Sequence, residues 1–219
     1  MHPRHPLLFW DLDGTLTDPK EGITKSVQHA LGRLGIPAPD LDALTPFIGP
    51  PLLTSFQEFY ALDLAKARQA VAYYRERFEH QGIFENKVFP EIPPLLAELR
   101  GLGVRMAVAT SKPLLLAERI LEHFDLRRHF YDVFGADLSG LISTKRDVLG
   151  LAVEGLTDAE RAAAAMIGDH PVDVEAARHH GLTAIAVLYG YGDPQRLREA
   201  MPHRTAASVG DLGKLLLLP

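Results

Sequence analysis

The sequence contains no cysteine among its 219 residues. This absence excludes disulfide bonds, thiol nucleophiles and cysteine-ligated zinc. No apolar run approaches the ~20 residues that a membrane-spanning helix needs. The first six residues also lack the long apolar core of a signal peptide. We therefore expect a cytoplasmic protein with no membrane partner.

The sequence also lacks a large excess of charge of either sign. The formal net charge is −5 and the pI is about 6.0, which argues against a polyanion such as nucleic acid as a partner. The composition, 47% hydrophobic and 23% charged, is that of a globular protein with a buried core. The length suits one domain that carries a modest insertion, and we expect a monomer or a dimer.

Short apolar segments alternate with helical patterns along most of the chain. Strands are predicted at residues 7–12, 104–109, 133–135, 163–167 and 183–187. Alternating strands and helices predict an α/β fold with a parallel sheet and helices on both of its faces. Ligands of such sheets bind beyond the carboxyl ends of the strands, so polar residues at these ends are candidates for a site.

One stretch, residues 17–83, shows helical patterns only. Asp18 is expected to cap a first helix, and Asp63 is expected to cap a longer second helix. The predicted organisation is an α/β core formed by residues 1–16 and 84–219, with an all-helical insertion between them.

Two carboxylates follow the first predicted strand. Asp11 and Asp13 would point to opposite sides of an extended strand, and Gly14 permits the turn that would bring them together. Phosphoryl transfer needs a nucleophile and a proton donor for the leaving oxygen, roles that suit Asp11 and Asp13 respectively. The same pattern also suits an ordinary aspartate-rich turn.

A second carboxylate pair follows the strand at 163–167. Asp169 lies at the strand end and Asp173 lies in the first turn of the next helix, so both could reach one hard cation. Asp173 could instead only complement the helix dipole.

Hydroxyl and basic residues lie at two other candidate positions. Thr110, Ser111 and Lys112 stand between a buried strand and a helix, where hydroxyls and free amides bind phosphate. Lys145 precedes an apolar helix. Taken singly, a threonine here could be a helix cap and a lysine a solvated charge.

Together these four segments resemble the motifs of the haloacid dehalogenase superfamily, in the same order. The matching stretches are DLDGTLTD, VATSKP, STKRDVL and IGDHPVDVEAA. Phosphoglycolate phosphatase-like members look most similar, through FIGPPL, YYRERF and VLYGYGDP. The resemblance implies a Rossmann-like core, and it makes the insertion at 17–83 a helical cap.

The resemblance also implies roles for the residues. Mg²⁺ would be held by Asp11, Asp169 and the backbone carbonyl of Asp13, with Asp173 supporting it. Lys145 would neutralise the nucleophile and the phosphate. The phosphoryl group would be cradled by the Thr110 hydroxyl and by backbone amides of Leu12, Asp13 and Ser111, with Lys112 beside them. The product would form by hydrolysis of an aspartyl-phosphate on Asp11.

The cap would select the substrate, a small phosphorylated metabolite. Phe47 and Ile48 lie in a loop that Gly49, Pro50 and Pro51 stiffen, and Arg75 could hold a substrate carboxylate. Arg75 is equally suited to a solvated position on its helix.

Other activities fit the same motifs. A sugar phosphomutase shares them but returns the phosphoryl group to substrate. A haloacid dehalogenase or a phosphonate hydrolase is less consistent, because neither needs an acid at Asp13. A non-catalytic sensor would keep the fold, but every candidate catalytic side chain is present here.

Overall fold

The computed structural model describes residues 2–137, 142 and 144–218. Its contacts divide the chain into two compact units. The core unit comprises Met1–Asp18 and Val88–Pro219, and the helical unit comprises Pro19–Lys87. The assignment of 17–83 as a cap stays a prediction. In the described residues, no helix has the length and apolar character required to cross a membrane.

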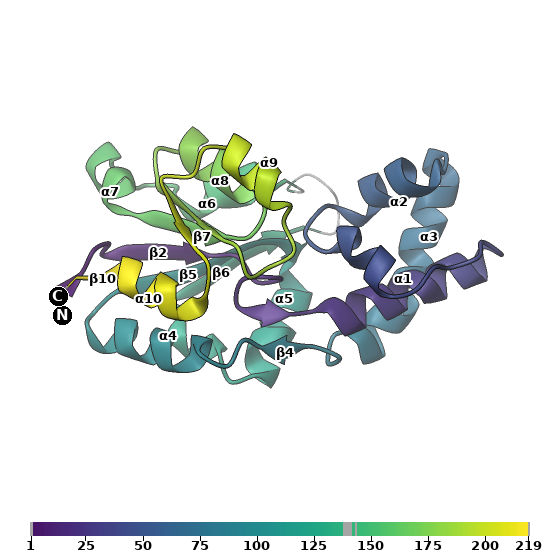
Figure 1. Cartoon of the computed structure of the whole chain (residues 1–219), viewed down its shortest axis with the longest axis horizontal. Helices are drawn as coiled ribbons and strands as arrows, with labels where there is room; N and C mark the ends of the chain where they lie inside the picture. Colours follow the sequence, from purple (N-terminus) through teal and green to yellow (C-terminus); the bar gives the residue numbers. More distant parts are fainter. Residues whose placement is uncertain (1, 138–141, 143, 219) are drawn as a thin grey trace. The chain divides into compact units, whose positions relative to one another are not determined.

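A six-stranded sheet with the order β6-β5-β2-β7-β8-β9 forms the centre of the core unit (Figure 1). Each pair of neighbouring strands in it is parallel. The strands are β2 (Leu7–Trp10), β5 (Arg105–Pro113), β6 (Asp132–Ala136), β7 (Ala165–Gly168), β8 (Thr183–Val187) and β9 (Arg204–Ala206). The predicted α/β fold is therefore confirmed. Two short strands, β1 (His2–Pro3) and β10 (Leu217–Leu218), pair antiparallel outside this sheet.

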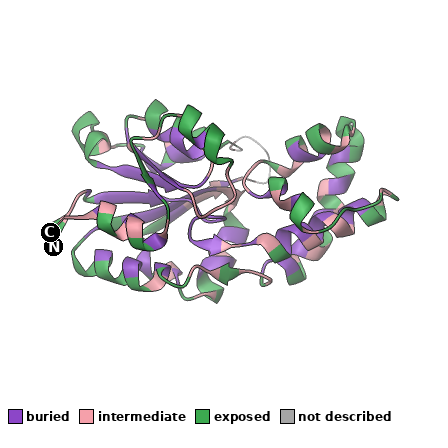
Figure 2. Ribbon diagram, in the orientation of Figure 1, coloured by how far each residue is buried: buried purple, intermediate pink, exposed green. Residues whose placement is uncertain are grey.

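Helices cover both faces of the sheet (Figure 1). They are α4 (Ile92–Gly101), α5 (Leu114–His123), α6 (Lys145–Ala152), α7 (Asp158–Ala163), α8 (Pro171–His179), α9 (Pro194–Glu199) and α10 (Val209–Leu216), with a 3₁₀ turn, η3, at Arg127–His129. On one face, alternate strand residues such as Phe9, Ala107 and Met166 pack with Val148 of α6 and Val174 of α8. The central strands β2 and β7 are buried along their whole length (Figure 2), which explains their continuous apolar runs.

The order of the strands positions the site. After the central strand β2, the chain forms β5 and β6 on one side of β2, and then β7, β8 and β9 on the other. Parallel α/β sheets bind ligands where the strand order reverses in this way, which here is the carboxyl end of β2, between the connections of β5 and β7. Asp11, Thr110 and Asp169 occupy positions at these strand ends.

The helical unit contains α1 (Lys20–Arg33), a 3₁₀ helix η1 (Asp42–Phe47), α2 (Leu52–Tyr60) and α3 (Leu64–Arg77). The last helix continues as a π-helical turn η2 (Phe78–Gly82). Short strands β3 (Thr17–Asp18) and β4 (Lys87–Val88) lie where the chain leaves and re-enters the core unit. Asp63 caps α3 as predicted, by accepting a hydrogen bond from Lys66 N.

Several local predictions are wrong, among them the strand expected at 163–167, which is β7 at Ala165–Gly168 because Ala163 ends α7. The first strand ends at Trp10, not at residue 12, because the chain turns after Asp11. The strand expected at 104–109 extends to Pro113, since it keeps pairing with β6 across a register shift. Asp18 does not cap α1; Pro19 holds that position without a side-chain hydrogen bond, and the Asp18 carboxylate instead accepts one from the Tyr191 hydroxyl.

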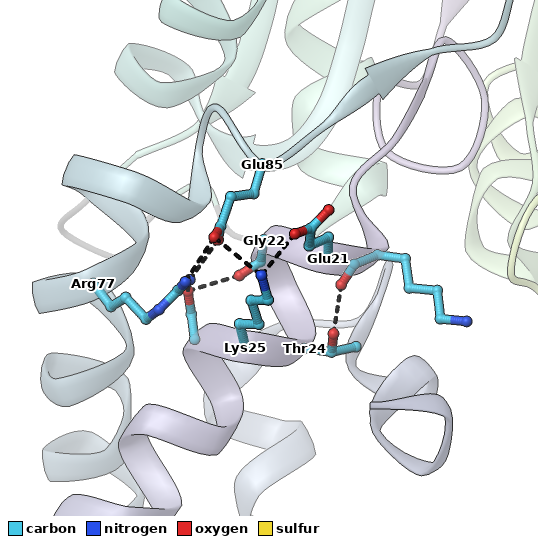
Figure 3. Close-up of polar contacts among 8 residues, drawn as sticks. Glu21, Gly22, Thr24, Lys25, Arg77 and Glu85 are labelled. Atoms are coloured by element: carbon cyan, nitrogen blue, oxygen red, sulfur yellow. Dashed lines mark hydrogen bonds and ion pairs between the residues drawn. The ribbon is translucent and has the colours of Figure 1, made fainter. Parts of the chain in front are cut away.

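A network of ion pairs links α1, α3 and the segment after η2 within the helical unit (Figure 3). The guanidinium of Arg77 donates two hydrogen bonds to Glu85, at 2.7 and 2.8 Å. Lys25 adds ion pairs to Glu85 and Glu21. The hydrogen bonds from Arg77 hold the pKa of the Glu85 carboxyl below its usual value of 4.5. The network therefore contributes stability only while Glu85 is ionised.

We expect Arg77→Ala to lower the free energy of unfolding by about 1 kcal/mol at pH 7, because it removes a two-pronged, half-buried ion pair. Glu85 has a lowered pKa in the folded state, so its contribution is complete above pH 4.5 and is lost as the pH falls through the folded pKa. The difference between variant and wild type in urea denaturation should thus shrink at pH 3. Arg68→Ala, at an exposed position on the same helix, is the control. A pH-independent difference would contradict this account.

Candidate active site

The turn after β2 brings two carboxylates to the carboxyl end of the sheet. Asp11 N still donates to Ile167 O at 2.9 Å, so Asp11 remains anchored to β7. The chain then folds back, with the amides of Leu16 and Thr17 donating to Leu12 O at 2.9 and 3.0 Å. Gly14 has a φ of +81°, which a residue with a side chain rarely adopts. Both Asp11 and Asp13 are buried.

Lys145 lies directly beside Asp11. Its Nζ is 2.5 Å from Asp11 Oδ1, 2.9 Å from Asp173 Oδ1 and 3.0 Å from the carbonyl of Ala109. A capping box between Thr144 and Asp147 fixes the start of α6 and hence the position of this lysine. Burial opposes the charge of Lys145, but the carboxylates of Asp11 and Asp173 outweigh it and raise the lysine pKa above its usual value. Lys145 is therefore a permanent cation in the site.

Asp169 and Asp173 complete a group of three buried carboxylates. Asp173 accepts a hydrogen bond from His170 N at 3.0 Å, in the first turn of α8. Burial, and then the charges of Asp11 and Asp173, raise the pKa of Asp169 to about 8. Burial also raises the pKa of Asp173, although Lys145 acts in the opposite direction.

These three carboxylates fit a divalent cation. Asp11, Asp169 and Asp173 offer oxygen atoms that lie within 4.8 Å of one another. Asp11 Oδ1 and Asp173 Oδ1 are both buried, and both face the same cation, the Lys145 ammonium. One ammonium cannot balance three carboxylates, and an all-oxygen donor set suits a hard metal ion. Asp13 lies outside this side-chain group; the role that the resemblance implies for it uses its backbone carbonyl.

Thr110, Ser111 and Lys112 form the end of β5. Thr110 is buried, and its hydroxyl accepts a hydrogen bond from Lys112 N at 3.2 Å. The Lys112 ammonium lies 2.8 Å from Asp13 Oδ2. Burial raises the pKa of Asp13 above its usual value, and Lys112 opposes this shift. The sequence assigns Lys112 to the phosphate; its contact with Asp13 could not be read from spacing.

The candidates for substrate recognition in the helical unit differ in burial. Phe47 and Ile48 are 3% and 2% exposed. The Phe47 ring packs edge-on against Phe56 and Phe59 at centroid distances of 5.0 and 5.2 Å, so it belongs to the core of this unit. Arg75, on α3, is half-buried. A contact of these three residues with substrate stays a prediction.

The turn at 189–192, between β8 and α9, contacts the site, a role that the sequence did not indicate. Tyr191 N donates to Asp169 Oδ2 at 2.7 Å, and the Tyr189 hydroxyl donates to Thr15 O at 3.0 Å. The sequence signal was present, since two glycines alternate with two tyrosines directly after a predicted strand. By itself, however, this pattern does not indicate which residue the turn would contact.

Comparison with known proteins agrees with this geometry. Residues 8–187 match the model of the family described as "Haloacid dehalogenase-like hydrolase". A protein of Pseudomonas aeruginosa named "5'-nucleotidase" is 46% identical over 97% of this chain and 96% of its own length. "Tyrosine-protein kinase PtkA" of Mycobacterium tuberculosis is 41% identical over 85% of this chain, which spans only 63% of that protein. The crystal structure of a predicted phosphatase from Clostridium acetobutylicum superposes with a TM-score of 0.91 at 43% identity, covering 96% of this chain and 97% of that one.

The chain therefore belongs to the haloacid dehalogenase-like hydrolase family. Within that family it is a phosphatase, and its relatives imply small phosphorylated substrates. Members of this family typically use a metal ion, and the buried aspartate group of the core unit is where such an ion fits.

Proposed function

We propose that this chain is a Mg²⁺-dependent phosphatase that hydrolyses small phosphate monoesters through an aspartyl-phosphate on Asp11. The observation that carries the proposal is the position of Asp11, whose Oδ1 lies 2.5 Å from Lys145 at the carboxyl end of the central strand. Nucleoside 5′-monophosphates are the first substrates to consider, because the 46% identical relative is named a 5'-nucleotidase.

Each residue has a defined task in this reaction. An Asp11 carboxylate oxygen attacks phosphorus, and the bond between phosphorus and the leaving oxygen breaks. Asp13 donates its proton to that oxygen, and its raised pKa favours the protonated form. Asp13 then takes a proton from water as the water oxygen attacks the acyl phosphate, which frees inorganic phosphate and restores Asp11.

The surrounding groups stabilise the transferring phosphoryl group. Lys145 and the Thr110 hydroxyl would contact its oxygens, with Ser111 and Lys112 beside them. Asp11, Asp169 and Asp173, with the Asp13 carbonyl, would hold Mg²⁺, which supplies positive charge to the phosphate oxygens when bound.

The test is a phosphate-release screen with Mg²⁺. It should include nucleoside 5′-monophosphates, 2-phosphoglycolate, sugar phosphates and pyridoxal phosphate, with the Asp11→Asn variant as the blank. We expect release from at least one class and none from the blank. Conversion of a sugar phosphate to its isomer without release of phosphate would instead support a phosphomutase.

The mycobacterial relative motivates a second candidate, transfer of a phosphoryl group to tyrosine. Incubation with γ-labelled ATP separates the two activities. An aspartyl-phosphate is labile to alkali and hydroxylamine, whereas phosphotyrosine survives alkali. We expect any label on the chain to be labile; alkali-stable label on tyrosine would support the kinase activity.

The helical unit is proposed to act as a cap that recognises the leaving group of the substrate and so determines specificity. Arg75→Ala should lower kcat/KM for the best substrate about 10-fold, through loss of a charged contact, and should change p-nitrophenyl phosphate hydrolysis much less. Phe47→Ala should destabilise the helical unit, because the ring is buried; the milder Phe47→Leu is the better probe of recognition. Equal losses on both substrates would contradict a role for Arg75 in specificity.

A further inference from the structure

We propose that Tyr191 is a positioning residue that fixes the orientation of Asp169 and links it to Asp18. Asp18 is the last residue of the core unit before the chain enters the helical unit. All contacts that support the proposal lie within the core unit, and they involve the turn at 189–192.

The turn lies directly against Asp169. Tyr191 N donates a hydrogen bond to Asp169 Oδ2 at 2.7 Å. Gly190 makes this approach possible, because a Cβ there would lie 2.4 Å from Asp169 Cβ and 2.4 Å from Gly14 O. The turn therefore fills the space between Asp169 and the loop that carries Asp11.

Asp169 depends on this turn for its orientation. Its other hydrogen bond in the described part of the chain comes from the Thr15 hydroxyl, at a long 3.4 Å. No lysine or arginine of the described residues forms an ion pair with it. The N–H of Tyr191 is thus the strongest single contact that holds this carboxylate in place.

Two tyrosine hydroxyls hold the turn itself. The Tyr191 hydroxyl donates to Asp18 Oδ1, and the Tyr189 hydroxyl donates to Thr15 O at 3.0 Å. Burial raises the pKa of both tyrosines above the usual value, so both hydroxyls keep their protons and remain donors.

The second crossing between the units contacts the same turn. The Tyr189 ring packs edge-on against Phe89, with centroids 5.0 Å apart, and Phe89 N donates to Leu16 O at 3.2 Å. Phe89 follows Val88, where the chain re-enters the core unit. Both crossings are therefore connected to Asp169 through contacts of this turn.

The test measures metal binding directly, by electron paramagnetic resonance of free Mn²⁺ during titration of the whole protein. Tyr191→Phe removes only the hydroxyl, and we expect it to weaken Mn²⁺ binding about 10-fold, the scale for partners that orient metal ligands. Asp18→Ala should have the same effect, and the double variant should be no weaker than either single variant. Asp18→Asn keeps an acceptor oxygen and should restore most of the affinity.

Controls separate this role from general damage. Tyr131→Phe changes an exposed tyrosine of the core unit and should bind as wild type does. Circular dichroism and the Tm of the metal-free proteins check folding; if Tyr191→Phe unfolds, Tyr189→Phe tests the same turn through its other hydroxyl.

Each outcome decides the inference. Wild-type affinity in folded Tyr191→Phe would overturn it, and additive losses in the double variant would overturn the link to Asp18. The inference rests on the metal site of the proposed function. Absence of Mn²⁺ binding by the wild type would overturn that site as well, and so the two failures are distinguishable.

Discussion

Asp11→Asn should fold normally and lose at least about 10³-fold in turnover, the scale for removal of a covalent nucleophile. Asparagine has nearly the same size and keeps the buried position, but its amide cannot attack phosphorus. Lys145 retains its second carboxylate partner, Asp173, at 2.9 Å, so the buried cation is not left alone. Phosphate release at saturating substrate and Mg²⁺ measures the effect, and circular dichroism checks the fold.

Asp158→Asn is the matched control for this experiment. Asp158 is an exposed aspartate in the first turn of α7, and its replacement should leave turnover unchanged. Beryllofluoride, which mimics a phosphoryl group on a carboxylate, should inhibit the wild type and should not bind Asp11→Asn. If the Asp11 variant kept more than about a tenth of wild-type turnover, another residue would have to be the nucleophile.

Much of the core unit could be predicted from the sequence, because its pattern is local. The apolar segment at 183–187 is β8 with the predicted bounds. Polar residues directly after buried strands indicated where a site would form, since parallel strands end at the same edge of the sheet. The structure brings Asp11, Asp169, Asp173 and Lys145 together at that edge.

Contacts between segments distant in the sequence could not be predicted in this way. The ion pair between Lys112 and Asp13 depends on how far β5 extends past its last buried residue. Asp18 has the local features of a helix cap, but Pro19 holds the cap position of α1. The Asp18 carboxylate accepts a hydrogen bond from the Tyr191 hydroxyl, which lies 173 positions away in the sequence. α2 was also missed, since the stretch before it reads as a proline-containing loop.

The distribution of charge explains why a cation fits this site. Lys112 faces Asp13, and Lys145 faces both Asp11 and Asp173. Asp169 has no such partner among the described residues, and its pKa is raised to about 8 by burial and by the other two carboxylates. At neutral pH Asp169 therefore keeps its proton unless a bound cation favours the ionised form.

Removal of divalent metal should therefore reduce turnover to below about 1% of the wild-type value, and Mg²⁺ should restore it. Protein prepared without metal and assayed in excess EDTA gives the first measurement, and titration with Mg²⁺, Mn²⁺ or Co²⁺ gives the second.

Mg²⁺ should also raise the Tm, because a ligand that binds only the folded state stabilises it by about 2.7 kcal/mol at 100 times its Kd. Asp169→Asn should lose both the activity and the rise in Tm on addition of Mg²⁺. The metal-free variant should be no less stable than the metal-free wild type, because one of three neighbouring buried carboxyl groups has been removed. Asp158→Asn should respond to Mg²⁺ as the wild type does. Full turnover in EDTA would rule out a metal-dependent reaction at this site.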